Sequence, residues 1–100
     1  MSIYKIVISQ SAELEYASAY HYYEDQLVGL GDRFEKETDF LIDKLKQNPY
    51  LFERRFKYYR EANLNKFPYF IIYEIIADSV IIHSFFHSKR HPAKKLKRKK

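Results

Sequence analysis

Residues 67–76 read Phe-Pro-Tyr-Phe-Ile-Ile-Tyr-Glu-Ile-Ile, and this stretch decides the fold. Its centre, Tyr69 to Tyr73, is apolar on both faces of an extended chain, which is typical of a strand in the middle of a sheet. Two further extended segments flank it, Phe56 to Leu64 and Ser79 to His87, and the links between the three are short. We therefore predict an antiparallel meander of three strands.

The first half of the chain predicts one strand and two helices. Residues 3–8 are rich in β-branched side chains and predict a central or well-covered strand. Ser9 or Ser11 is suited to cap a helix that runs to Leu27. After two glycines a second helix begins near Asp32 and ends before Asn48–Pro49, because proline disfavours helical geometry in the preceding residue. Its predicted inner stripe is Phe34, Thr38, Leu41 and Leu45.

This order of elements is β-α-α-β-β-β and indicates an α+β fold. Two helices joined by a short link lie antiparallel, and together they would cover one face of a mainly antiparallel sheet. One hundred residues suffice for one domain. We expect a single domain over residues 1–92 and a basic, flexible tail over 93–100.

Composition excludes several classes of function. The chain has no cysteine, so it has no disulfide framework and no thiolate metal site. No apolar run approaches the ~20 residues that cross a bilayer, and no signal peptide is evident, so we expect a soluble cytoplasmic protein without membrane partners. We also expect no cofactor and no metal. His83, His87 and His91 invite a zinc interpretation, but residues four apart on a strand lie ~13 Å from each other.

Charge divides the chain into an acidic and a basic half. Residues 1–47 carry five Lys and Arg against nine Asp and Glu, whereas residues 48–100 carry thirteen against four. A basic half favours an anionic partner, either nucleic acid or an acidic protein segment. The candidate nucleic-acid-binding residues are Lys57, Lys66, Lys89, Lys94 and Lys95, although the terminal cluster is equally a solubilising tail.

Alternation along the strands brings four polar side chains toward one possible patch. His83 and His87 should share a face with Ile81 and Phe85. If the helices cover the opposite face, the open face would present the candidate functional patch: Arg60, Tyr73, His87 and Arg90.

Such a patch could cleave RNA without a metal. His87 or Tyr73 would take the proton of the 2′-hydroxyl, and the two arginines would stabilise the charged phosphorane. The simpler alternatives are an ion pair of Arg60 with a nearby glutamate, packing of Tyr73 within the sheet, and a structural role for His87. Whether the chain is an enzyme is left open by these residues.

The chain resembles the RelE/ParE toxin superfamily of type II toxin–antitoxin systems. The resemblance rests on Arg60 in a strand, the segment Phe67 to Ile75, and His87–Ser88–Lys89–Arg90–His91–Pro92, and it extends over residues 3–92. It implies a β-α-α-β-β-β fold and a growth-inhibiting toxin, of the kind that stabilises plasmids. It also implies a cognate antitoxin and a toxin–antitoxin hetero-oligomer. The Phe-Pro-Tyr strand and the His-x-x-Arg-x-Pro ending resemble the ParE-like branch more than the RelE-like branch.

Three functions are therefore compared. The first is a ParE-like toxin that binds and disables DNA gyrase. The second is a RelE-like endoribonuclease that cuts mRNA on the ribosome. The third is a non-toxic nucleic-acid-binding module that uses the basic C-terminal tail.

Overall fold

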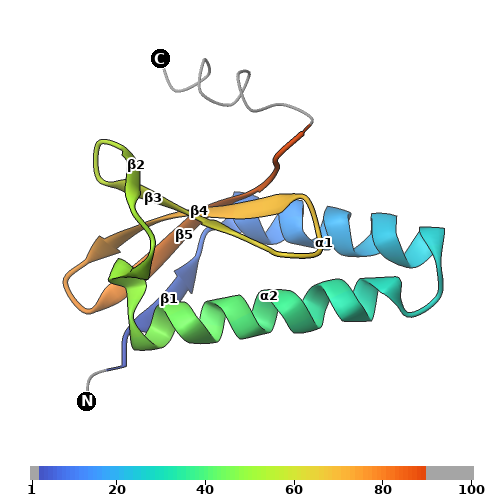
Figure 1. Cartoon of the computed structure of the whole chain (residues 1–100), viewed down its shortest axis with the longest axis horizontal. Coiled ribbons are helices and arrows are strands. Elements are labelled where there is room, and N and C mark those ends of the chain that lie inside the picture. Colours follow the sequence, from blue (N-terminus) through green and yellow to red (C-terminus); the bar gives the residue numbers. More distant parts are fainter. Residues whose placement is uncertain (1–2, 90–100) are drawn as a thin grey trace.

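Two helices lie against one face of a five-stranded sheet (Figure 1). The computed structural model describes residues 3–89. Along this part of the chain the elements are β1 (Lys5–Ile8), α1 (Gln10–Gln26), α2 (Leu30–Gln47), a single 3₁₀ turn (Pro49–Leu51), β2 (Arg54–Phe56), β3 (Tyr59–Asn63), β4 (Tyr69–Ile76) and β5 (Ser79–His87). The α+β class and the helical hairpin are confirmed, and β2 is a strand more than the sequence predicted.

The strand order β1-β5-β4-β3-β2 places β4 in the middle of the sheet, as its apolar run predicts. β1 pairs in parallel with β5, from Lys5 opposite Ser79 to Ile8 opposite Ile82, and the other pairs are antiparallel. The expectation that β1 is a central or well-covered strand is wrong. It is an edge strand, and its alternate residues Lys5 and Val7 face solvent.

The helical hairpin is held by a close backbone approach and by two caps. The Ser9 hydroxyl accepts a hydrogen bond from the backbone N–H of Ala12 at 3.1 Å, which makes Ser9 the cap of α1. A Cβ atom at Gly31 would lie 2.9 Å from the carbonyl oxygen of Tyr20, so only glycine allows the helices to pack this closely. The Glu24 carboxylate accepts from the N–H groups of Gly29 and Gly31, each at 2.9 Å, and so caps α2.

The core is centred on the ring of Phe34, which is completely buried. The rings of Tyr16, Tyr23, Phe67 and Tyr69 surround it, with centroids 5.3–5.5 Å away. Burial of the whole predicted inner stripe of α2 is confirmed. The first helix was predicted to run to Leu27, but α1 ends one residue earlier and Leu27 is exposed.

The predicted strand from Phe56 to Leu64 is instead a hairpin. Phe56 pairs with Tyr59, and the two residues between them form the turn. Lys57 adopts a φ of +53°, in the left-handed region that favours glycine. A single strand from Phe56 to Leu64 would place Phe56, Tyr58 and Arg60 on one face, but the chain reverses between Phe56 and Tyr59, so this alternation does not hold.

A bulge in β5 shifts the alternation of its side chains. Ile72 lies opposite Ser84, whereas Tyr73 lies opposite Ile82, so His83 is an extra residue in β5. From Ser84 onward each position lies on the face opposite to the one that simple alternation predicts. His87 consequently lies on the same side of the sheet as Tyr73, which faces the helices, and the predicted shared face of His83 and His87 is wrong.

A glutamate of α1 continues the hydrogen bonding of β5 beyond the end of β1. The last residue of β1, Ile8, lies opposite Ile82. Three residues further along, the backbone N–H of Phe85 donates to the Glu15 carboxylate at 3.0 Å, and the Ser84 hydroxyl donates to the same oxygen at 2.9 Å. Glu15 thus satisfies the strand edge where no neighbouring strand is present.

Candidate functional site

Arg60 and Tyr73 are neighbours across β3 and β4. The Tyr73 hydroxyl donates to the carbonyl oxygen of Pro49 at 2.6 Å, and the Arg60 guanidinium donates to the carbonyl oxygen of Phe52, also at 2.6 Å. The guanidinium also lies 5.0 Å from the centre of the Tyr50 ring. Both side chains therefore fasten the segment between α2 and β2 to the sheet.

The position of Tyr73 makes it a poor proton acceptor. Its side chain is completely buried and faces the helices, not the open face of the sheet as expected. Burial raises the pKa of Tyr73 to about 12, and the nearby charge of Arg60 only partly offsets this effect. The hydroxyl is neutral near pH 7 and is already engaged as a donor.

His87 lies far from this pair. It is opposite Tyr69, with the two rings 5.0 Å apart, and its Nδ1 accepts from the backbone N–H of Lys89 at 3.1 Å. Tyr69 and Tyr73 are four residues apart on one strand, so His87 and Tyr73 are separated by ~13 Å. The structure brings together Arg60 and Tyr73 but not His87, and Arg90 lies outside the described residues.

Of the candidate lysines within residues 3–89, Lys66 and Lys89 line one surface pocket, whereas Lys57 lies apart from them. Lys57 is at the tip of the β2–β3 hairpin, Lys66 is in the loop between β3 and β4, and Lys89 is exposed just after β5. Lys94 and Lys95 lie outside the described residues. The lysines of the described part of the chain therefore do not form one patch.

The bulge creates a polar pair that the sequence analysis missed. The imidazole Nε2 of His83 lies 2.7 Å from a carboxylate oxygen of Glu74, and the Tyr59 ring packs edge-on against the imidazole at 5.4 Å. All three side chains are partly exposed on the open face. No local sequence signal could have paired residues 74 and 83, because strict alternation does not locate a bulge.

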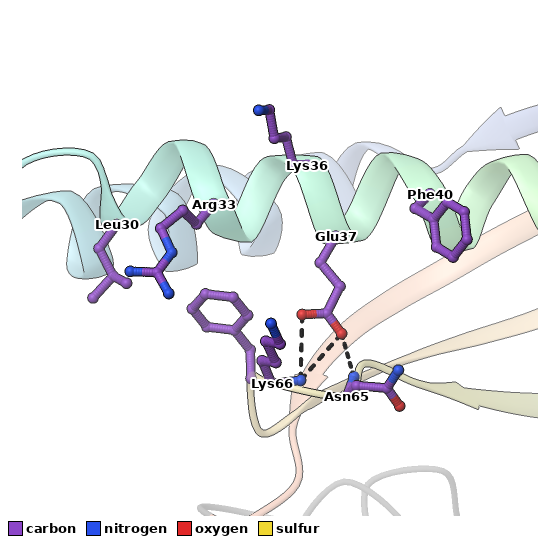
Figure 2. Close-up of a pocket in the computed structure, with 8 residues that line it drawn as sticks. Leu30, Arg33, Lys36, Glu37, Phe40, Asn65 and Lys66 are labelled. Atoms are coloured by element: carbon purple, nitrogen blue, oxygen red, sulfur yellow. Dashed lines mark hydrogen bonds between the residues drawn. The ribbon is translucent and has the colours of Figure 1, made fainter.

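A surface groove runs between α2 and the loop that joins β3 to β4 (Figure 2). Its volume is about 490 Å³, and it is lined by Leu30, Arg33, Lys36, Glu37, Phe40, Asn65, Lys66 and Phe67. The Glu37 carboxylate accepts from the backbone N–H groups of Asn65 and Lys66 and so ties the loop to the helix. Arg33 extends toward the loop, whereas Lys36 points away from it.

Two general features of the described part of the chain bear on partners and ligands. No helix among residues 3–89 is long and apolar enough to cross a membrane. Over the same residues, no three His, Asp or Glu side chains form a set that could hold a metal ion.

Comparisons with known proteins agree with the fold. The sequence model of a ParE toxin of a type II toxin–antitoxin system, parDE, matches residues 6–92. A solved chain from the chromosomal ParDE toxin–antitoxin system of P. aeruginosa superposes with a TM-score of 0.75 at 11% identity, over 87% of this chain and 98% of that one. No curated protein sequence matches.

Proposed function

Because the chain belongs to the ParE toxin family of type II toxin–antitoxin systems, we propose that it stops growth by binding and disabling DNA gyrase. We propose further that a cognate antitoxin neutralises it. The observation that carries the proposal is the family match over residues 6–92, which extends over nearly all of the described fold.

The state of Tyr73 supports target binding over catalysis. Of the three patch residues that the structure describes, Arg60 and Tyr73 lie together, and both are engaged with backbone carbonyl groups. A general base must reach the proton that it removes and must be able to accept it. A buried, neutral Tyr73 that donates to Pro49 does neither.

Purified gyrase provides the direct test. We expect the full-length protein to inhibit ATP-dependent supercoiling of a plasmid and to leave gyrase-linked DNA breaks. Expression of the protein alone should arrest growth, and co-expression of its cognate antitoxin should relieve the arrest. Unchanged supercoiling together with cleaved mRNA in the arrested cells would overturn the gyrase proposal.

Ribosome-dependent RNA cleavage is the second candidate, and His83 is the observation that favours it. A carboxylate 2.7 Å from an imidazole orients the ring as in many general bases. If the protein is a ribonuclease, His83→Ala should abolish growth arrest and mRNA cleavage at unchanged stability. If it is a gyrase poison, His83→Ala should keep both the arrest and the gyrase-linked breaks.

We propose the groove beside α2 as the docking surface for the antitoxin. It combines exposed Phe40 with the cations Arg33 and Lys66, and the groove carboxylate, Glu37, is already satisfied by two backbone N–H groups. An acidic, amphipathic segment complements such a surface through its apolar face and its charge.

Charge reversal in the groove tests this assignment. Arg33→Glu with Lys66→Glu should weaken antitoxin binding by at least tenfold and leave growth arrest intact. Lys46→Glu, on the same helix but outside the groove, is the matched control and should bind normally. Equal affinity of the double variant and the control would place the antitoxin elsewhere.

A further inference from the structure

The β2–β3 hairpin is the part of the sheet farthest from β1. β2 is the outermost strand of the sheet, and the hairpin projects beyond the helical layer (Figure 1). All residues from Glu53 to Tyr58 are exposed to solvent. Their side chains are therefore not required to fill the core.

The hairpin carries two exposed aromatic side chains. The Phe56 side chain is 46% exposed and the Tyr58 side chain 55% exposed, and Tyr50 and Leu51, just before the hairpin, are equally accessible. Tyr58 packs against Tyr59 in a tilted arrangement, with the ring centres 4.9 Å apart. Exposed rings on a hairpin that is outside the core are available to a binding partner.

Cations alternate with these rings. Within residues 53–58, Arg54, Arg55 and Lys57 stand against one carboxylate, that of Glu53, and the Lys57 ammonium lies 5.6 Å from the centre of the Phe56 ring. Among the described residues, Arg55 forms an ion pair with Glu61 of β3 at 3.5 Å, with the Arg55 side chain 67% exposed. An exposed pair of this kind contributes little, so the charge is available to a ligand.

We propose that the β2–β3 hairpin binds single-stranded nucleic acid. Cations attract the phosphate backbone, and exposed rings stack on unpaired bases; this combination is how single strands are bound without sequence preference. A duplex would offer phosphates but no free base faces, so Phe56 and Tyr58 would have no role. An acidic peptide would match the charge but would leave the rings without stacking partners.

This activity is additional to gyrase inhibition and does not depend on it. The affinity for an oligonucleotide is measured without gyrase, antitoxin or growth. Failure of one proposal therefore leaves the other standing.

Fluorescence anisotropy with labelled 15-nucleotide oligo(dT) and oligo(rU) tests the proposal on the full chain at several salt concentrations. Phe56→Ser with Tyr58→Ser should weaken binding about 30-fold or more at every salt concentration, because two stacking platforms are lost. The matched control, Leu27→Ser with Val28→Ser, removes exposed apolar groups from the link between the helices and should bind like the wild type.

A charge variant separates the phosphate contacts from the stacking. Arg54→Gln with Lys57→Gln should reduce the slope of log affinity against log salt by about 1.4, since each phosphate contact with a single strand contributes about 0.7. Lys36→Gln with Lys46→Gln, on α2, removes the same charge outside the hairpin and should leave the slope unchanged.

Photocrosslinking to an oligonucleotide with 5-bromodeoxyuridine locates the contact directly. Adducts on Phe56 or Tyr58 are expected. Adducts confined to residues 94–100, or equal affinities for the ring variant and its control, would overturn the proposal. Retained oligonucleotide binding with loss of gyrase inhibition in the ring variant would also overturn it and would assign the hairpin to a protein partner.

Discussion

The ring cluster around Phe34 and the β2–β3 hairpin have nearly the same chemistry, since both are rich in phenylalanine and tyrosine beside strands. Phe34 is completely buried under the helices, whereas Phe56 is 46% exposed at the edge of the sheet. The two regions differ in what lies over them. Aromatic residues contribute to folding in the first region and are available for binding in the second.

The largest effect is expected from Phe34→Ala. The substitution leaves a cavity among four surrounding rings, and it should lower the free energy of unfolding by about 3–5 kcal/mol. Urea titration measures the loss. Phe40→Ala is the matched control on the same helix, where the ring is 64% exposed, and should change stability by less than ~0.5 kcal/mol. If Phe34→Ala lowered the free energy of unfolding only slightly, the ring cluster would not differ from the hairpin in its contribution to folding.

Tyr73→Phe should cost about 1–3 kcal/mol, because the Pro49 carbonyl loses its buried donor. It should also change the response to alkaline pH. The pKa of Tyr73 is about 12 in the folded protein and ~10 in the unfolded chain. The neutral hydroxyl therefore stabilises the fold fully below pH ~10, and this contribution is lost as the pH rises toward 12.

Thermal unfolding between pH 9 and 12 tests this expectation. The melting temperature of the wild type should fall more steeply than that of Tyr73→Phe. The hydrogen bond to Asp32 also raises the pKa of Tyr20 to about 12, but Tyr20 is present in both proteins, so the difference isolates Tyr73. Parallel pH profiles would show that Tyr73 already ionises near pH 10 in the folded state.

Glu37→Gln should have an intermediate effect of about 1 kcal/mol. It weakens the charged hydrogen bonds that tie the β3–β4 loop to α2. Hydrogen exchange of the Asn65 and Lys66 amides should accelerate, with little change in the strand amides. Asp43→Asn removes an exposed charge from the same helix and should leave these two amides unaffected. Unchanged exchange in Glu37→Gln would mean that the loop is held by its turn alone.

The smallest effect on stability is expected from Phe56→Ser with Tyr58→Ser. Both rings are exposed, so the free energy of unfolding should change by less than ~0.5 kcal/mol per residue. Chemical denaturation measures the free energy of unfolding. Phe67→Ser, which alters a buried ring, serves as a comparison variant that should be destabilised. A loss above ~2 kcal/mol for the double variant would show that the hairpin rings are part of the folding core.

The helices were predictable because their signals are local. A serine at the cap, apolar residues three or four apart, and Asn48–Pro49 at the end each act within one or two turns. α1 begins and α2 ends where these signals place them, but α2 begins at Leu30, two residues before the predicted start, and includes Gly31. The central position of β4 was predictable for a similar reason, since a run that is apolar on both faces requires cover on both faces.

The candidate site was harder to predict because it depends on two irregularities. The hairpin turn at Lys57 contains no glycine or asparagine, the residues that usually indicate such a turn. The sequence therefore predicted one strand where the structure has β2 and β3. The extra residue at His83 reverses the sides of all later residues in β5, and a period of two cannot reveal where that occurs. Glu37 reaches a loop 28 residues away, with no signal in either segment.

The contact between Glu15 and the backbone of β5 limits how this molecule can associate with others. An uncovered strand edge invites another chain to extend the sheet, and here a carboxylate occupies the donor that an incoming strand would need. Without that carboxylate, the backbone N–H of Phe85 would be free to pair with a strand of a second copy, which would extend the sheet. Glu15 therefore protects the end of β5 from the addition of a strand, whereas the outer edge of β2 remains accessible.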